Sequence, residues 1–250
     1  MNAIVDEKKV PENLLGNLNE TSVNSSHELL NKNLNKDGYL FLKNVVASKE
    51  VELARNEVFK KLYEINEIKE PYNEGIFSGK SDRDALYKDR GDFWKVVSDL
   101  DSVRNITNGK ILHNIFDNIF GSPSIGFDFI FLRPVANGKS TKMHCDSGFF
   151  TRKTKKVLTC WFVFTEISLD RGPLFIIENS HNFEDLKNQY LDFDVAIHKD
   201  RKAMINVDPI EFAKQRDSKI LTAHFKPGDA LIFGMYTLHG TFQNHAIDNK

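Results

Sequence analysis

The sequence has few cysteines and no long apolar run. Only Cys145 and Cys160 occur among its 250 residues, too few for a disulfide framework. No apolar stretch approaches the roughly 18 residues of a membrane span. The N-terminus also lacks the apolar core of a signal peptide. We therefore expect a cytoplasmic protein without a membrane-spanning segment, in which both thiols pack as small hydrophobic groups.

The chain also has no marked excess of positive or negative charge. Lysine and arginine together number 34 and aspartate and glutamate 35, so no net field would attract nucleic acid or an anionic membrane. Hydrophobic residues make up 40% of the chain, which leaves ample surface for a core. The sequence has no internal repeat, and its length fits one large domain. These properties favour a small-molecule partner and leave the oligomeric state open.

Regular apolar periodicity is scarce in the first 36 residues. This segment holds eight asparagines and several serines, which predicts a loosely ordered arm with one short helix near residues 27–34. Residues 37–46, DGYLFLKNVV, follow with a turn-prone Asp-Gly and then strand formers, so they predict a strand. We expect the arm at residues 1–36 and a single domain at residues 37–250.

The next part of the chain is predicted to be largely helical, from about residue 48 to residue 121. Residues 48–63 have helical spacing, with Ser48 as a candidate N-cap. Residues 72–88 are polar and contain glycine, which favours a long loop. A second helix is expected over residues 102–120, ending at Gly121.

After about residue 126 the pattern changes to short runs of strand formers separated by Pro-Gly, Asn-Gly and Arg-Gly turns. The runs are FDFIFLRPV, KKVLTCWFVFTEI, GPLFIIENS, ILTAHFKPG and GDALIFGMYTLHG. Helices followed by a group of strands predict an antiparallel sandwich or barrel at residues 126–250 with helices on one side. Residues 182–217 are charged and favour helix, so we interpret them as a crossover loop or lid.

One short motif, KMHCDSGFF, indicates metal binding. Successive side chains of a strand alternate between its faces, so His144 and Asp146 would share one face while Cys145 points away. His239 is the expected third ligand if it faces the interior at the end of its strand. Two histidines and a carboxylate on one side of an ion leave positions open for other ligands and favour non-haem Fe(II).

Other interpretations of these histidines stay open. The chain has eight histidines, and a His-x-Asp pair is commonly a surface pair or a hydrogen-bonded core histidine. His224 precedes the Lys-Pro-Gly-Asp turn, on the far side of that turn from the expected site strand. His245 follows the strand and is expected in a loop. We therefore rank His239 ahead of both.

The order of the motifs carries a family resemblance. HCD, then LTCWFVFTEISLDRGPLFIIENSH, then FKPGDALIFGMYTLHGTFQN resembles the phytanoyl-CoA dioxygenase-like branch of the Fe(II)/2-oxoglutarate oxygenases, and DGYLFLKNVV is similar to that family's N-terminal strand. The resemblance runs from Asp37 to the C-terminus. It implies a mainly β fold with flanking helices around a double-stranded β-helix, a cupin-like jelly roll. It also implies Fe(II) bound by His144, Asp146 and His239.

By the same resemblance, the co-substrates are 2-oxoglutarate and O₂. Oxidative decarboxylation would yield succinate and CO₂ while a small organic molecule is oxidised, and an intact Asp146 favours hydroxylation over halogenation. Trp161 lies in the strand where similar proteins keep a large side chain near the co-substrate, and alternation places Thr159 on the same face. Thr241 matches a position where similar proteins place a hydroxyl near the 2-oxoglutarate carboxylate. Trp161 can equally be a core residue.

Relatives usually carry an arginine about 10 to 12 residues after the distal histidine, whose guanidinium binds the far carboxylate of 2-oxoglutarate as a fork. Here that window ends at Lys250. Three interpretations follow: Lys250 substitutes as a point charge, the arginine lies in a continuation of the chain, or the co-substrate pocket is incomplete. Arg133 is an alternative partner for an anionic ligand, although it can also form a structural salt bridge.

Substrate contacts are the least specified part of the prediction. Phe149, Phe150 and Arg152 follow Asp146 and are candidates to line the substrate pocket, with packing and solvation as the competing roles. Two further functions remain as alternatives. One is a non-catalytic or regulatory jelly-roll metal-binding protein with an incomplete co-substrate site. The other is a cupin-like enzyme that uses iron without 2-oxoglutarate.

Overall fold

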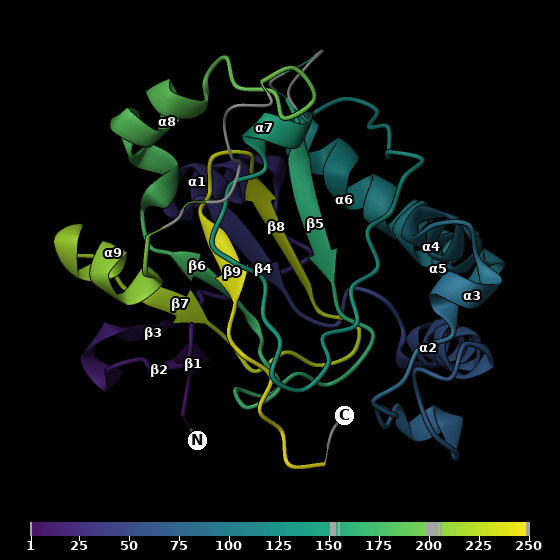
Figure 1. The fold of residues 1–250 in the computed structure, drawn as a ribbon. Coiled ribbons are helices and arrows are strands. Elements are labelled where there is room, and N and C mark those ends of the chain that lie inside the picture. Colours follow the sequence, from purple (N-terminus) through teal and green to yellow (C-terminus); the bar gives the residue numbers. More distant parts are fainter. Residues whose placement is uncertain (1, 151–153, 155, 199–204, 206, 249–250) are drawn as a thin grey trace.

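The computed structural model describes residues 2–150, 154, 156–198, 205 and 207–248 (Figure 1). Within these residues, short strands form two larger sheets and one small hairpin, and helices lie on the outer sides of the sheets. The described helices contain more residues than the strands. The architecture is therefore mixed α and β, and the expectation of a mainly β chain is wrong in this respect.

The first sheet has three antiparallel strands in the order β4-β8-β5. They are β4 (Tyr39–Leu42), β8 (Ala230–Gly234) and β5 (Leu158–Phe162). Phe233 of β8 pairs with Tyr39 on one side and with Thr159 on the other. The strands β4 and β5 were expected from their strand formers, and the pairing brings together parts of the chain that are far apart in sequence.

The second sheet has four strands in the order β3-β7-β6-β9. They are β3 (Leu15–Asn17), β7 (Ile220–Thr222), β6 (Leu174–Ile177) and β9 (His239–Thr241). The β3–β7 pair is parallel and the other pairs are antiparallel. Because β9 is an edge strand, one of its sides remains open to the segment that carries the HCD motif.

The two sheets pack face to face over an apolar cluster. Alternate residues of the facing strands supply it, since successive side chains of a strand point to opposite faces. The strand residues in this cluster are Tyr39, Phe41, Leu174, Ile176, Leu221, Leu231 and Phe233. Phe225 closes the cluster, with ring centroids 5.1 Å from Phe41 and 4.8 Å from Trp161 in edge-to-face contact.

Helices cover the outer face of the three-stranded sheet, where Leu40, Leu42 and Ile232 are buried. These helices are α1 (His27–Asp37), α2 (Ser48–Glu64), α5 (Asp101–Thr107) and α6 (Lys110–Phe120). Two further helices, α3 (Arg83–Leu86) and α4 (Arg90–Ser98), and the short turn η2 (Tyr72–Glu74) lie beside α2. This side of the molecule (Figure 1) thus matches the helical part expected between residues 48 and 121.

The outer face of the four-stranded sheet has a thinner cover. Its buried residues Phe175, Ile177 and Ile220 pack with apolar side chains of the N-terminal segment and of the helices α8 and α9. The elements on this side are β1 (Ile4–Val5), β2 (Lys8–Lys9), η1 (Glu12–Leu14), η3 (Ser180–Asn182), α8 (Glu184–Tyr190) and α9 (Pro209–Gln215). The predicted insertion at 182–217 thus contains two helices, and part of it lies outside the described residues.

The N-terminal segment differs from the loosely ordered arm that we expected. Its predicted helix is present as α1, but β3 also joins the four-stranded sheet, and Val5 and Val10 are buried against the same core. A strand of three residues is too short to show alternation in the sequence. Its stability comes from pairing with β7, which lies about two hundred residues further along the chain.

Two other expected elements are interrupted. Residues 102–120 form α5 and α6 instead of one helix, because the chain bends at Gly109, where a Cβ atom would lie 1.8 Å from the Asn105 carbonyl oxygen. The run at 228–240 is also divided, with a turn between β8 and β9. The run FDFIFLRPV at 127–135 forms no strand.

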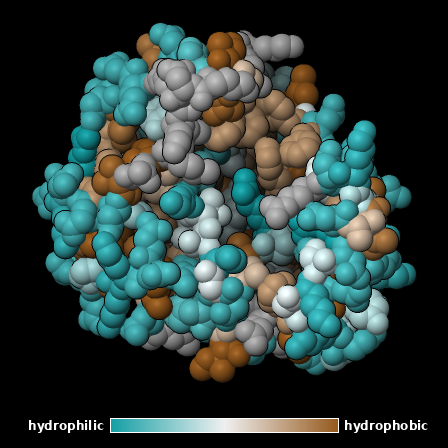
Figure 2. Space-filling model, viewed as in Figure 1, coloured by the Kyte–Doolittle hydropathy of each residue, from teal (hydrophilic) through white to brown (hydrophobic). Residues whose placement is uncertain are grey.

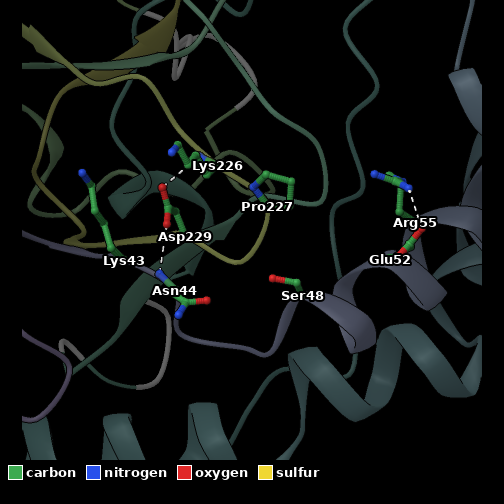
Figure 3. Close-up of a pocket in the computed structure, with 8 residues that line it drawn as sticks. All are labelled: Lys43, Asn44, Ser48, Glu52, Arg55, Lys226, Pro227 and Asp229. Carbon is green, nitrogen blue, oxygen red and sulfur yellow. Dashed lines mark hydrogen bonds and ion pairs between the residues drawn. The ribbon is translucent and has the colours of Figure 1, made fainter.

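A buried carboxylate fixes the end of the three-stranded sheet that lies near the start of α2 (Figure 3). Asp229 Oδ1 accepts a hydrogen bond from the backbone N–H of Asn44 at 3.0 Å, and Oδ2 accepts one from the N–H of Lys226 at 2.8 Å. Asn44 has a positive φ of 50°, a conformation that asparagine tolerates. The Pro-Gly-Asp turn predicted from the sequence therefore ties the β7–β8 connection to the β4–α2 connection.

None of the helices formed by the described residues combines the length and the apolar character needed to cross a membrane.

Candidate metal centre

The HCD motif is held beside β9 by two backbone hydrogen bonds. The N–H of His144 donates to the carbonyl of His239, and the N–H of His239 donates to the carbonyl of His144, both at 2.9 Å. After Asp146 the chain turns into the short helix α7 (Ser147–Phe150), and the N–H of Ser147 donates to the carbonyl of Met235. These contacts place the motif at the end of the sheets where β8 turns into β9.

Three side chains meet at this point. Asp146 Oδ1 lies 3.7 Å from Nε2 of His144 and 3.8 Å from Nε2 of His239. The two imidazole rings have centroids 4.3 Å apart, and one ligand atom from each of the three residues lies within 4.8 Å of the others. All three residues are buried. The structure thus brings together the three ligands that the sequence predicts.

Backbone carbonyls orient both imidazoles. Nδ1 of His144 lies 2.8 Å from the carbonyl oxygen of Lys142, and Nδ1 of His239 lies 3.0 Å from that of Thr237. A carbonyl can only accept, so each Nδ1 carries the proton and each Nε2 has a free lone pair. Both lone pairs are therefore available on the side of Asp146, the arrangement in which outer hydrogen bonds fix metal-binding histidines.

A hydroxyl group orients the carboxylate. Thr159 Oγ1 donates to Asp146 Oδ2 at 2.6 Å, which leaves Oδ1 as the oxygen nearer to the two imidazoles. Thr159 was expected near the co-substrate. The structure shows a contact of its hydroxyl with the candidate ligand itself, a role that no spacing in the sequence indicates.

Electrostatics keep His239 uncharged. Burial lowers the pKa of His239 to about 4, because an imidazolium loses its hydration there. The Asp146 carboxylate opposes this shift, whereas the charges of His144 and Arg133 add to it. At neutral pH the imidazole of His239 is therefore in the neutral form that binds metal ions.

The donor set fits a bound metal ion. Two nitrogen atoms and one carboxylate oxygen meet from one side, the arrangement of the two-histidine, one-carboxylate facial triad. Ligand atoms about 2.1 Å from one ion are roughly 3 to 4 Å from each other. The 3.7 Å and 3.8 Å separations measured here fall within that interval. Because all three ligand atoms lie within 4.8 Å of one another, small side-chain shifts would let the three residues share one ion without rearrangement of the backbone.

Two residues expected near the co-substrate are placed as follows. Trp161 packs between the sheets against Phe225, which agrees with the alternative core role. Thr241 is buried in β9, and its Oγ1 accepts the N–H of Thr141 at 2.7 Å. The O–H of Thr241 is therefore able to donate a hydrogen bond to another acceptor.

Of the three predicted cationic residues, Arg133 lies within the described part of the structure. Arg133 is exposed and lies within electrostatic range of His239, since its charge contributes to the lowered pKa of that histidine. Its guanidinium also lies over the ring of Phe131, at 5.5 Å from the centroid. Lys250 and Arg152 lie outside the described residues.

The two phenylalanines after Asp146 have different surroundings. Phe149 packs against the core of the four-stranded sheet. Phe150 is half-buried and contacts Phe127 and Phe131, with ring centroids at 5.6 Å and 6.0 Å. The rings of Phe127 and Phe131 were not among the predicted site residues, although the alternation in FDFIFLRP places them on the same side as Arg133.

The other candidate histidines lie apart from the cluster. His224 pairs with Glu166 at 2.7 Å on an exposed part of the surface. His245 has Nδ1 3.1 Å from the carbonyl oxygen of Gln243. A cavity of about 490 Å³ beside the Asp229 turn (Figure 3) is also separate, because Lys43, Ser48, Arg55 and Lys226 line it and none of the three candidate ligands does.

Two imidazoles and one carboxylate, buried at one end of two facing sheets, define the class of non-haem iron oxygenases. The model of the phytanoyl-CoA dioxygenase (PhyH) family matches residues 34–248, and the chain belongs to this family. The protein is accordingly a non-haem Fe/2-oxoglutarate-dependent enzyme, and its cofactors are iron and 2-oxoglutarate. Among curated proteins, no sequence match was found.

Solved structures share the fold. The epimerase SnoN, in complex with Fe³⁺, alpha ketoglutarate and nogalamycin RO, has 15% identity and a TM-score of 0.56, and the match covers 90% of this chain and 79% of SnoN. The carbocyclase SnoK from nogalamycin biosynthesis has 15% identity and a TM-score of 0.53, with 92% and 82% covered. EvdO2 from Micromonospora carbonacea var. aurantiaca has 15% identity and a TM-score of 0.53, with 91% and 88% covered.

Proposed function

We propose that the protein hydroxylates a small organic molecule at an Fe(II) centre held by His144, Asp146 and His239, with 2-oxoglutarate and O₂ as co-substrates. One observation carries this proposal: the three buried ligand atoms lie within 4.8 Å of one another. The backbone carbonyls and Thr159 turn their lone pairs to a common point. Such an arrangement costs burial of polar groups, which a bound cation would offset.

Fe(II) held in such a site would bind and activate O₂. The four electrons that reduce O₂ would come from 2-oxoglutarate, which is oxidised to succinate and CO₂, and from the substrate, which is hydroxylated. In this reaction one oxygen atom of O₂ enters succinate and the other enters the substrate. The residues of the chain hold the metal-binding side chains in place. The Lys142 and Thr237 carbonyls hold the two imidazoles, and Thr159 holds the carboxylate.

For the co-substrate, we propose that Arg133 and Thr241 contact the carboxylates of 2-oxoglutarate. Arg133 lies over the Phe131 ring and forms no ion pair with another described residue, and its charge contributes to the lowered pKa of His239. A guanidinium binds a carboxylate through two parallel hydrogen bonds. The Thr241 hydroxyl, two residues after His239, has a proton to donate. Lys250, the other predicted cation, lies outside the described residues.

The finer fold assignment is part of the same proposal. We propose that the two facing sheets are the double-stranded β-helix, or jelly roll, of the cupin-like enzymes. The face-to-face packing and the antiparallel pairs of β6 with β7 and β9 support it. A cytoplasmic location belongs to the proposal as well, because both cysteines are free thiols.

Measurement of succinate formation and substrate oxidation distinguishes the two alternative functions from the proposed one. A regulatory metal-binding protein would bind iron and produce no succinate. An iron enzyme that does not use 2-oxoglutarate would oxidise a substrate without it. The assay therefore measures succinate from 2-oxoglutarate with the full chain, Fe(II) and ascorbate, with and without candidate substrates. Absence of succinate in every mixture would contradict the proposal.

The ligand assignment has its own experiment. The variants His144→Ala, Asp146→Ala and His239→Ala are each expected to lose iron binding and succinate formation, because each removes one of three ligands. His224→Ala is the matched control, since that histidine is exposed and pairs with Glu166. Iron content is measured after anaerobic loading and desalting. Full iron content in the three ligand variants would refute the assignment.

A further inference from the structure

A group of phenylalanine rings lies at the surface next to the metal centre. Rings of Phe129 and Phe131 have centroids 4.6 Å apart, so these residues, two apart in sequence, lie on the same side of the chain. Phe150 contacts Phe127 and Phe131. We call these four residues, Phe127, Phe129, Phe131 and Phe150, the aromatic wall. Figure 2 shows apolar side chains gathered around α7, near the top of the view.

The wall leaves much apolar surface in contact with water. Phe127, Phe129 and Phe131 are 56%, 53% and 55% exposed. With about 200 Å² for each side chain, the three rings expose roughly 300 Å². An area of this size is typical of the largest apolar patch on a soluble monomer, which is often functional. The neighbouring Leu132, by contrast, packs inward against the cluster around α2 and α4. The outward side of this segment is therefore the apolar one.

The short helix α7 connects the wall with the metal centre. Phe150 ends α7, the helix that begins directly after Asp146, and the N–H of Phe149 donates to the Asp146 carbonyl at 3.0 Å. Phe150 in turn contacts Phe127 and Phe131, with ring centroids at 5.6 Å and 6.0 Å. The aromatic wall is thus joined through α7 to the segment that carries two of the three candidate ligands, His144 and Asp146.

We propose that the aromatic wall binds the apolar, ring-bearing body of the substrate and holds it beside the iron; this inference rests on the proposed function. The four side chains are uncharged and offer only ring faces and edges. Phe129 meets Phe131 at an interplanar angle of 74°, and Phe131 meets Phe150 at 78°. Such edge-to-face pairs form a corner that receives a further ring. A sugar or a free amino acid would find no hydrogen-bond partner on these rings.

The chemistry therefore selects an aromatic or alicyclic substrate over a polar metabolite of equal charge. A suitable test compares 2-naphthoate with D-gluconate, because both are monoanions and only the first carries rings. Binding is measured by calorimetry on the full chain loaded with Fe(II) and 2-oxoglutarate under anaerobic conditions. We expect 2-naphthoate to bind at least about tenfold more tightly than gluconate.

Variants of the wall make the test specific. Phe131→Ala and Phe150→Ala are each expected to weaken 2-naphthoate binding about tenfold, since each removes one ring contact and its buried area. Phe131→Leu keeps the apolar volume and should lose less. The control is Leu53→Ala, because Leu53 is 56% exposed and lies on α2. Iron content is measured for every variant.

The outcomes separate the two proposals. Unchanged naphthoate affinity in both alanine variants, with iron bound and succinate formed, would overturn the wall as a substrate site and leave the proposed function standing. Failure of the unchanged chain to bind iron or to form succinate would contradict the proposed function itself. A dimer that dissociates in the variant Phe127→Asp, seen by sedimentation, would assign the wall to a second copy of the chain and likewise overturn the inference.

Discussion

The hydroxyl of Thr159 donates to Oδ2 of Asp146 at 2.6 Å. Thr159 lies in β5 at the position paired with Phe233, and the ring of Phe233 lies 4.5 Å from that of His239. The three-stranded sheet thereby supports two of the three candidate ligands, one by a hydrogen bond and one by packing. Loss of such support of a ligand by a neighbouring group typically lowers metal affinity about 10- to 100-fold.

The first prediction concerns this hydrogen bond. Thr159→Val keeps the shape of the side chain and removes the hydroxyl, so the Asp146 carboxylate loses its only described side-chain donor. Iron affinity should fall about 10- to 100-fold. It is measured by competition with a chelator of known affinity, and the unfolding midpoint is recorded for the same samples.

Thr159→Ser is the matched control, because it retains a hydroxyl at the same atom position. Its iron affinity should stay within about threefold of the unchanged protein. If the valine variant binds iron as tightly as the serine variant, the hydroxyl does not hold the carboxylate in the metal-bound protein, and the described contact has no role in affinity.

The residues of the candidate metal centre could be predicted from the sequence, but the strand pairing that brings them together could not. Alternation within the motif predicted that His144 and Asp146 share a side, and the order of motifs pointed to His239. The strand that was expected to carry His239 is nevertheless divided between β8 and β9. His239 reaches the centre because it pairs with His144 across the edge of the sheet. That pairing depends on tertiary contacts, which sequence patterns do not record.

The same physical reason explains the other differences. A strand of three residues such as β3 has no periodicity to detect, and it is stable only against β7. The run 127–135 has the composition of a strand, yet its outward rings contact one another and Phe150 of α7 instead of a neighbouring strand. Helix α2, by contrast, was confirmed nearly to the residue, because seventeen consecutive residues provide several turns of periodic signal.

The second prediction concerns Arg133. Arg133→Gln removes the positive charge that we propose binds a carboxylate of the co-substrate. The Kd for 2-oxoglutarate should therefore rise about tenfold. A larger change is not expected, because the guanidinium is exposed and solvent weakens its ion pairs. Calorimetry on the Fe(II)-loaded protein without O₂ measures it. Arg55→Gln serves as the control, since Arg55 pairs with Glu52 at the cavity beside the Asp229 turn, which none of the three candidate ligands lines. An unchanged Kd in Arg133→Gln would exclude this arginine as the anchor.

The third prediction concerns stability at the Asp229 turn (Figure 3). Asp229 is 3% exposed and accepts the backbone N–H groups of Asn44 and Lys226. Asp229→Ala leaves both donors without this acceptor, and the free energy of unfolding should fall by about 3 kcal/mol. Urea unfolding measures it.

Two controls refine the Asp229 experiment. Asp229→Asn keeps one acceptor oxygen and should lose roughly half as much free energy of unfolding as Asp229→Ala. Glu52→Ala, on the surface of the same cavity, should change the free energy of unfolding by less than about 0.5 kcal/mol. Equal stability of the alanine and asparagine variants would show that the two N–H groups find other partners.

The last prediction concerns the thiols. Burial raises the pKa of Cys160 to about 12 and raises that of Cys145 as well, because a thiolate in apolar surroundings loses its hydration. The thiolate is the form that reacts with iodoacetamide. At pH 8 the folded protein should therefore be alkylated at Cys160 about a thousandfold more slowly than a free cysteine. In urea both cysteines should react at the rate of the free amino acid. Mass spectrometry over a time course distinguishes the two sites, and rapid alkylation of Cys160 in the folded protein would mean that β5 opens on the time scale of the reaction.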